Sequence, residues 1–181
     1  MFVVQRKAVV MTAKGYLIVF YFLQLLTAQV QLRGCRKPLD VAFVVYAGSD
    51  ITDQIWYMLN SMSRDVSRQL RPSASGTHVA QMWFSGEWTV VRDLEGAVLQ
   101  WQYRTRARSL QSGRNLADAL EAVISLVLNN TGGDRPEVPD VVVVVTHGLV
   151  DDREAAIAQA NRLKAKGIRI VTVGMANTQV Q

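Results

Sequence analysis

Five consecutive valines, Val141–Val145, constrain the fold of this 181-residue chain more than any other feature. A run that is apolar on both faces favours a strand buried between two layers, because a half-exposed strand alternates apolar and polar residues. Two further runs, Val41–Tyr46 and Ile168–Val173, have the same β-branched character and lie close to Gly or Pro. The three runs predict central strands of a parallel sheet.

Helical patterns separate these runs. Ile51–Leu70 and Leu116–Leu128 place apolar residues three and four positions apart, as an amphipathic helix does. Asp151–Lys166 begins with acids and ends with lysines, which suits the helix dipole, and Gly167 is a natural C-cap. Three helices are therefore expected between and after the strands.

A hairpin is predicted between the first two helices, from Val79–Phe84 and Trp88–Val91. The order strand, helix, hairpin, helix, strand, helix, strand predicts an α/β fold. We expect a doubly wound, mostly parallel sheet with helices on both faces.

Composition excludes several other classes of protein. Apolar residues make up 49% of the chain and charged residues 19%, which is a globular balance. One cysteine and two histidines exclude a disulfide-rich small fold, a multi-cysteine zinc site and a histidine-rich metalloenzyme.

The N-terminus is typical of an export signal. Residues 1–15 carry positive charges, and Tyr16–Ala28 is an apolar stretch of signal-peptide length. We expect residues 1–28 to be cleaved and the mature chain to be secreted; an uncleaved anchor and a buried helix remain as alternatives. Residues 29–37 are then a short linker that carries Cys35, an odd cysteine in an oxidising compartment. It can pair with another chain or with a cysteine beyond this sequence.

The basic charge belongs largely to this leader. The formal charge is +5, but the first 28 residues contain three bases and no acid. The later basic run, Arg104, Arg106 and Arg108, lacks a recognisable nucleic-acid-binding module around it. We expect no nucleic-acid partner, and no membrane contact after signal cleavage.

Three segments of the predicted strands carry a family resemblance: Leu39–Val45, Gly133–Thr146 and Ile168–Gly174. They resemble the first, fourth and fifth strands of the von Willebrand factor type A domain, particularly its collagen VI and matrilin branch. The resemblance implies a domain over residues 38–181 of the kind that serves in adhesion and in extracellular matrix. Since the family continues with another strand and a closing helix, we expect this domain to be incomplete at its C-terminus.

Many domains of this family bind partners through a metal-ion-dependent adhesion site at the C-terminal edge of the sheet. The positions that match its motifs carry Tyr46, Gly48 and Asp50 for Asp-x-Ser-x-Ser, and His147 for the aspartate of Thr-Asp-Gly. Arg114 or Leu116 stands where the threonine is expected. Magnesium and calcium need hard oxygen ligands, usually carboxylates. We therefore expect a degenerate site with no metal and no other cofactor.

Two alternatives stay open for these loops. A shift of one residue would let Ser49 and Asp50 supply oxygen ligands, with Asp151 or Asp152 nearby. His147 could instead be a ligand for a soft metal or a pH-sensitive group.

The chain lacks the usual marks of an enzyme on such a sheet. The loop after the first strand is not a phosphate-binding glycine loop. Ser49, His147 and Asp151 could be written as a hydrolase triad, but no Gly-x-Ser-x-Gly elbow accompanies them. A non-enzymatic protein is expected.

The sequence thus predicts a secreted protein-binding module of the extracellular matrix that acts without metal. Its partners would be matrix proteins such as collagens or other chains of this family, and its expected contact residues are Tyr46, Asp50, Arg114 and His147. The alternative is a spacer or assembly domain of a collagen- or matrilin-like multimer, with Cys35 linking chains into a disulfide-bonded oligomer. Asn129, in Asn-Asn-Thr, is a candidate glycosylation site.

Overall fold

The structure is a computed structural model, and it describes residues 37–94, 111–148 and 150–175. Cys35 and the run Arg104–Arg108 lie outside these residues, as do the predicted signal and all of the linker except Lys37. The elements follow the order β1 (Asp40–Tyr46), α2 (Asp53–Gln69), β2 (His78–Phe84), β3 (Trp88–Arg92), α3 (Leu116–Ala122), η2 (Val123–Val127), η3 (Asn130–Gly132), β4 (Asp140–His147), α4 (Arg153–Ala165) and β5 (Arg169–Met175).

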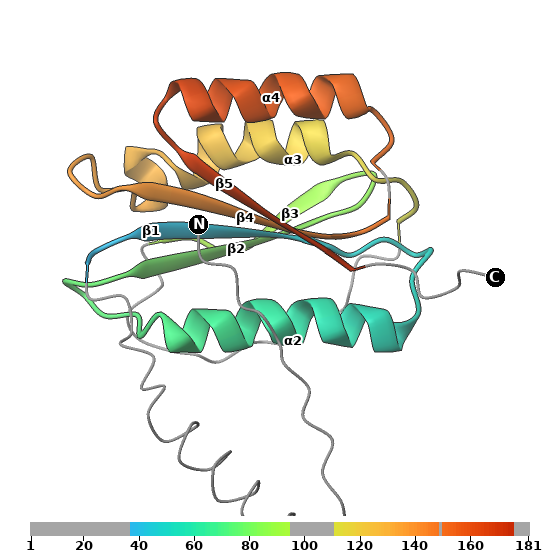
Figure 1. The fold of residues 1–181 in the computed structure, drawn as a ribbon, viewed down its shortest axis with the longest axis horizontal. Coiled ribbons are helices and arrows are strands. Elements are labelled where there is room, and N and C mark those ends of the chain that lie inside the picture. Colours follow the sequence, from blue (N-terminus) through green and yellow to red (C-terminus); the bar gives the residue numbers. More distant parts are fainter. Residues whose placement is uncertain (1–36, 95–110, 149, 176–181) are drawn as a thin grey trace, which may run out of the picture. The chain divides into compact units, whose positions relative to one another are not determined.

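One five-stranded sheet has the order β3-β2-β1-β4-β5. β2, β1, β4 and β5 are parallel, and β3 returns antiparallel to β2 as the predicted hairpin. Helix α2 covers one face of the sheet, and α3 and α4 cover the other (Figure 1). This arrangement confirms the predicted doubly wound α/β fold.

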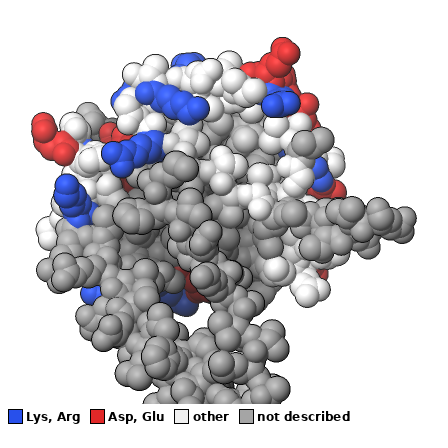
Figure 2. Space-filling model, in the orientation of Figure 1, with Lys and Arg blue, Asp and Glu red and all other residues white. Residues whose placement is uncertain are grey.

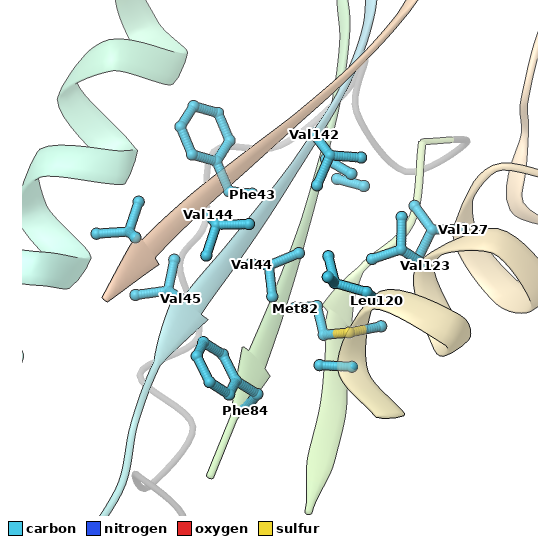
Figure 3. Close-up of a cluster of buried hydrophobic side chains, with 14 of the residues drawn as sticks. Phe43, Val44, Val45, Met82, Phe84, Leu120, Val123, Val127, Val142 and Val144 are labelled. Atoms are coloured by element: carbon cyan, nitrogen blue, oxygen red, sulfur yellow. The ribbon is translucent and has the colours of Figure 1, made fainter. Parts of the chain in front are cut away.

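The core is built around β1, whose seven residues are all buried. Side chains from both faces of the central strands are enclosed by helices, which explains why these strands are apolar throughout. Figure 3 shows Phe43 on the side of α2, whereas Met82 and Val142 lie on the side of α3, near Leu120 and Val123.

The helix boundaries differ slightly from those predicted. α2 begins at Asp53 because the Thr52 hydroxyl accepts a hydrogen bond from the Ile55 amide at 3.3 Å. The pattern over Leu116–Leu128 predicts one regular helix, but α3 ends at Ala122 and continues as a π-helical turn. The wider turn leaves Val123 and Val127 buried, so the apolar spacing is preserved although the hydrogen-bonding pattern changes.

At the end of the sheet where β1 and β4 begin, a buried ion pair holds the loop before β4. Asp40 has no exposed surface, and its carboxylate accepts hydrogen bonds from the Arg135 guanidinium at 2.5 and 3.0 Å and from the Arg135 amide at 3.0 Å. Arg135 Nη2 also donates to the Gly76 carbonyl at 2.8 Å, which links the loop before β2. The ion pair therefore fixes where three segments enter the sheet.

Among the described residues, no helix combines the length and the apolar character that a membrane crossing requires. The described helices lie against the sheet and belong to the layers around the core (Figure 1).

Candidate functional site

Three loops at the carboxyl ends of β1, β2 and β4 meet a fourth loop, the one before α3, at one edge of the sheet. We call this surface the rim; it comprises residues 47–52, 85–87, 111–115, 148 and 150–152. Backbone hydrogen bonds connect the loops: Ser49 N to Gln111 O, Asn115 N to Ser85 O, and Asp151 N to Arg114 O, at 3.0, 2.7 and 3.2 Å. The loop before α3 thus contacts the other three and sets the position of Arg114.

Arg114, Asp50 and Tyr46 form a connected cluster at the centre of the rim. The guanidinium donates to Asp50 through Nε, at 3.0 Å, and through Nη2. The Tyr46 hydroxyl donates to Asp50 Oδ1, and Arg114 Nε lies 3.4 Å from the same hydroxyl. The guanidinium carbon is 5.5 Å from the centre of the Tyr46 ring, within the range of a cation–π contact.

These contacts stabilise one set of charges. Burial disfavours the Asp50 carboxylate, but hydrogen bonds from Tyr46 and Arg114 and the arginine's charge outweigh it, so the pKa of Asp50 is below its usual value. Hydrogen bonds with Tyr46 and Asp50 raise the pKa of Arg114. Burial and then the bond to Asp50 raise the pKa of Tyr46 to about 12. At neutral pH the cluster contains a cation, an anion and a neutral phenol.

Two glycines are required by this packing. A Cβ atom on Gly48 would lie 2.0 Å from the Tyr46 hydroxyl oxygen and 2.8 Å from Asp50 Oδ1. A Cβ atom on Gly148 would lie 2.7 Å from Arg114 Nη1, and the positive φ of 85° at Gly148 also favours glycine. Neither role was visible in the sequence, because the first depends on how the Tyr46 and Asp50 side chains turn toward Gly48 and the second on Arg114, which comes from the loop before α3.

The carboxylates after β4 are bonded to backbone amides. Asp151 Oδ2 accepts from the Arg114 amide at 2.6 Å, and Asp152 caps α4 by accepting from the Ala155 amide at 2.9 Å. His147 is half-buried, and its Nδ1 has no hydrogen-bond partner among the described residues. Within these residues no hydrogen bond joins Ser49 to His147 or His147 to Asp151, so no triad geometry is present.

Burial corrects one expectation about contact residues. Tyr46 has no exposed surface, so its ring supports the rim from below and cannot touch a partner. The side chains of Arg114 and Asp50 are 26% and 40% exposed and can be reached from outside. The sequence contained a signal for this burial, because Tyr46 ends the apolar run Val41–Tyr46 that predicts a buried strand.

The fold and the sequence together show the family. The chain belongs to the family of the von Willebrand factor type A domain, whose model matches residues 40–181. It is 28% identical over 162 residues to von Willebrand factor A domain-containing protein 2 of Xenopus laevis, covering 87% of this chain and 20% of that protein. It is 26% identical over 172 residues to human matrilin-4, covering 90% of this chain and 27% of that protein. The chain thus spans about a quarter or less of these relatives.

Among solved structures, the fold is similar to proximal thread matrix protein 1 of the mussel byssus, in a form with a zinc-occupied MIDAS motif. The TM-score is 0.67 with 23% identity, over 83% of this chain and 40% of that one. At this identity the likeness concerns the fold alone.

Proposed function

We propose that this chain is a secreted, non-enzymatic protein-binding module of the extracellular matrix, and that its rim recognises partners without a metal ion. Its similarity to matrilin-4 supports the matrix setting. A signal over residues 1–28, a linker over residues 29–37 and a domain over residues 38–181 complete the proposal.

The observation that supports recognition without a metal ion is the ion pair between Arg114 and Asp50. The guanidinium lies among the rim loops and bonds both the Asp50 carboxylate and the Tyr46 hydroxyl. A divalent ion would have to share this space with a fixed positive charge, and the nearest rim carboxylates already bond to the arginine or its backbone. These residues do not fit a magnesium, manganese or calcium site.

Capture from a matrix extract tests the proposal. The immobilised chain should retain the same proteins in magnesium and in a chelator, because no ion takes part. Asp50→Asn and Arg114→Gln should reduce capture several-fold, whereas Arg68→Gln, an exposed arginine on α2, serves as the control. Capture that disappears with the chelator would contradict metal-free recognition, and capture that is unchanged by both rim substitutions would show that the rim is not the binding surface.

The second candidate function is an assembly or spacer domain, in which Cys35 links chains. An odd cysteine ahead of a secreted domain is the observation that favours it. Non-reducing gels of the secreted chain test this role: a dimer band that Cys35→Ser removes supports it, and a monomer alone counts against it.

We also propose that Asn129 is glycosylated. Asn129 Oδ1 accepts hydrogen bonds from the Thr131 hydroxyl and the Gly132 amide, each at 2.7 Å, in a half-buried turn after η2. The secreted chain should lose mass when treated with an amidase that removes N-glycans. An unchanged mass would show an unmodified asparagine.

A further inference from the structure

Charge is distributed unevenly between the two ends of the sheet. The acidic end, which comprises the rim, the adjoining strand ends and the first turns of α2, α3 and α4, holds seven acidic and two basic side chains. The other described residues hold seven acids and ten bases. Figure 2 shows acidic side chains at the upper right, around the N-terminal end of α4, and basic side chains at the upper left, around its C-terminal end.

The local cause is the direction of the helices. α2 and α4 each follow a strand of the parallel sheet, so both N-termini lie at the acidic end, where acids complement the helix dipole. The dipoles of these two helices contribute about half a positive charge each at that end, about +1 together. They do not neutralise a surplus of five acids, and the acidic end remains negative.

Among the described residues, basic side chains gather where α4 ends and β5 begins. Arg162, Lys164, Lys166 and Arg169 are exposed there, and we call them the basic corner. Arg162 lies 3.8 Å from Glu121, but both side chains are more than half exposed, so this pair is weak. Lys164, Lys166 and Arg169 have no acidic partner within the described part of the chain.

The two charged surfaces act independently of each other. Strands of seven or eight residues separate them, which corresponds to about 25 Å at ~3.3 Å per residue. The Debye length at physiological ionic strength is about 8 Å, so one surface hardly reduces the field of the other. Each is therefore available to a partner of opposite charge.

We propose that the acidic end of one copy of this chain binds the basic corner of a second copy, head to tail. The charges are complementary, and both surfaces belong to the same chain. Exposed aromatic side chains near the rim, Tyr57 and Trp88, supply surface for lysine stems and cation–π contacts. Because the contact is heterologous, each bound pair leaves one acidic end and one basic corner free, and the association continues as an open chain. The proposal rests on the rim as the binding surface of the proposed function and names one partner for it.

Sedimentation velocity of the purified secreted chain, under reducing conditions that prevent disulfide bonds through Cys35, tests this contact. The mean mass should rise with protein concentration in about 50 mM salt. In about 500 mM salt, where the Debye length is below 5 Å, the dissociation constant should increase at least ~10-fold. A monomer at every concentration in low salt would refute the proposal.

Charge reversal gives the sharper test. Lys164→Glu with Lys166→Glu should abolish association, and so should Glu87→Lys with Glu154→Lys, each pair measured in a chain that keeps its circular dichroism. An equal mixture of the two variants should associate again, because an acidic end then meets an intact basic corner. Arg68→Glu with Arg71→Glu, the same charge change at the end of α2, is the matched control and should still associate.

Two results would contradict the head-to-tail contact: association that survives both reversals, and a mixture that stays monomeric. The experiment contains only this chain, so its failure leaves capture of matrix proteins by the rim unaffected. Loss of that capture, in turn, would not change the sedimentation result.

Discussion

Arg114 has the strongest influence on the charges of the rim. Its guanidinium is the cation that faces the Asp50 carboxylate, and its backbone amide bonds Asp151. Arg114→Gln removes the charge, so Asp50 loses its main electrostatic partner. We expect a loss of about 1 kcal/mol in unfolding free energy, as for a partly exposed ion pair, measured by urea titration. Arg114→Lys should lose less, and equal stability of the native chain and Arg114→Gln would contradict the pairing.

Gly48 tests whether Tyr46 fills the space beside the first loop. Gly48→Ser restores the hydroxyl of the family's motif but places Cβ 2.0 Å from the Tyr46 oxygen. We expect a loss of about 2 kcal/mol from overpacking, measured by urea unfolding. In a Tyr46→Ala background the same substitution should cost much less, because the ring is gone. Equal costs in both backgrounds would refute the steric coupling.

The residues of the rim were predictable as a group but not in their roles. The motif positions identified Asp50 and Arg114, and the structure brings both together. Tyr46 was expected as a contact, yet it lies below the surface. Motif spacing predicts which loop a residue belongs to. The solvent exposure of its side chain depends on the residues of other loops that pack around it.

At the scale of elements, the Asp40–Arg135 ion pair holds the loop before β4. Arg135→Met leaves a fully buried carboxylate without its cation, and breaking such a pair costs about 3 kcal/mol or more. Urea unfolding should show this loss, and Asp40→Asn combined with Arg135→Met should recover part of it. A Met variant as stable as the native chain would show that the pair is not needed for the fold.

A second acidic group lies close to this ion pair. Burial, followed by the charge of Asp134, raises the pKa of Asp140 to about 7, and Asp40 adds to the effect. The arginine that faces these acids is Arg135, which bonds Asp40. Because the pKa in the folded chain exceeds the unfolded value, the folded chain binds more protons between about pH 4 and 7, and stability falls as pH rises through that interval.

Asp140→Asn should remove this part of the pH dependence. The variant should gain stability relative to the native chain at pH 8 and gain less at pH 5, measured by thermal unfolding. Glu137→Gln, an exposed acid of the same loop, is the control and should leave the difference between the two pH values unchanged. Parallel curves for the native chain and Asp140→Asn would contradict the raised pKa.

Strands were easier to predict than helix ends. Val41–Tyr46 and Val141–Val145 lie in β1 and β4, where helix layers cover both faces of the sheet. The run Ile168–Val173 also forms a strand, but β5 lies at the edge of the sheet and its Val171 is 47% exposed, so the expectation of a central strand was wrong there. The π-helical turn of Val123–Val127 was missed because it keeps the apolar spacing of a helix and changes only the hydrogen bonds. The ion pair of Asp40 was missed because 95 residues separate its partners.

At the scale of the whole molecule, net charge proved a poor guide. The formal charge of +5 suggests a basic protein, whereas the described domain has an acidic end and a basic corner. This separation of charge arises because the parallel strands align the helices. A net charge summed over the whole sequence cannot show it. The same alignment brings Arg114 and Asp50 to the rim, where the central claim is that a guanidinium stands in place of a metal ion.

Calorimetric titration of the purified chain with magnesium, manganese and calcium tests that claim most directly. We expect no binding tighter than millimolar for any of the three ions, and no change in the unfolding temperature at low millimolar concentrations, because Arg114 holds Asp50. Micromolar binding of any of these ions, lost in Asp50→Asn, would show that the rim still holds a cation and would contradict the account.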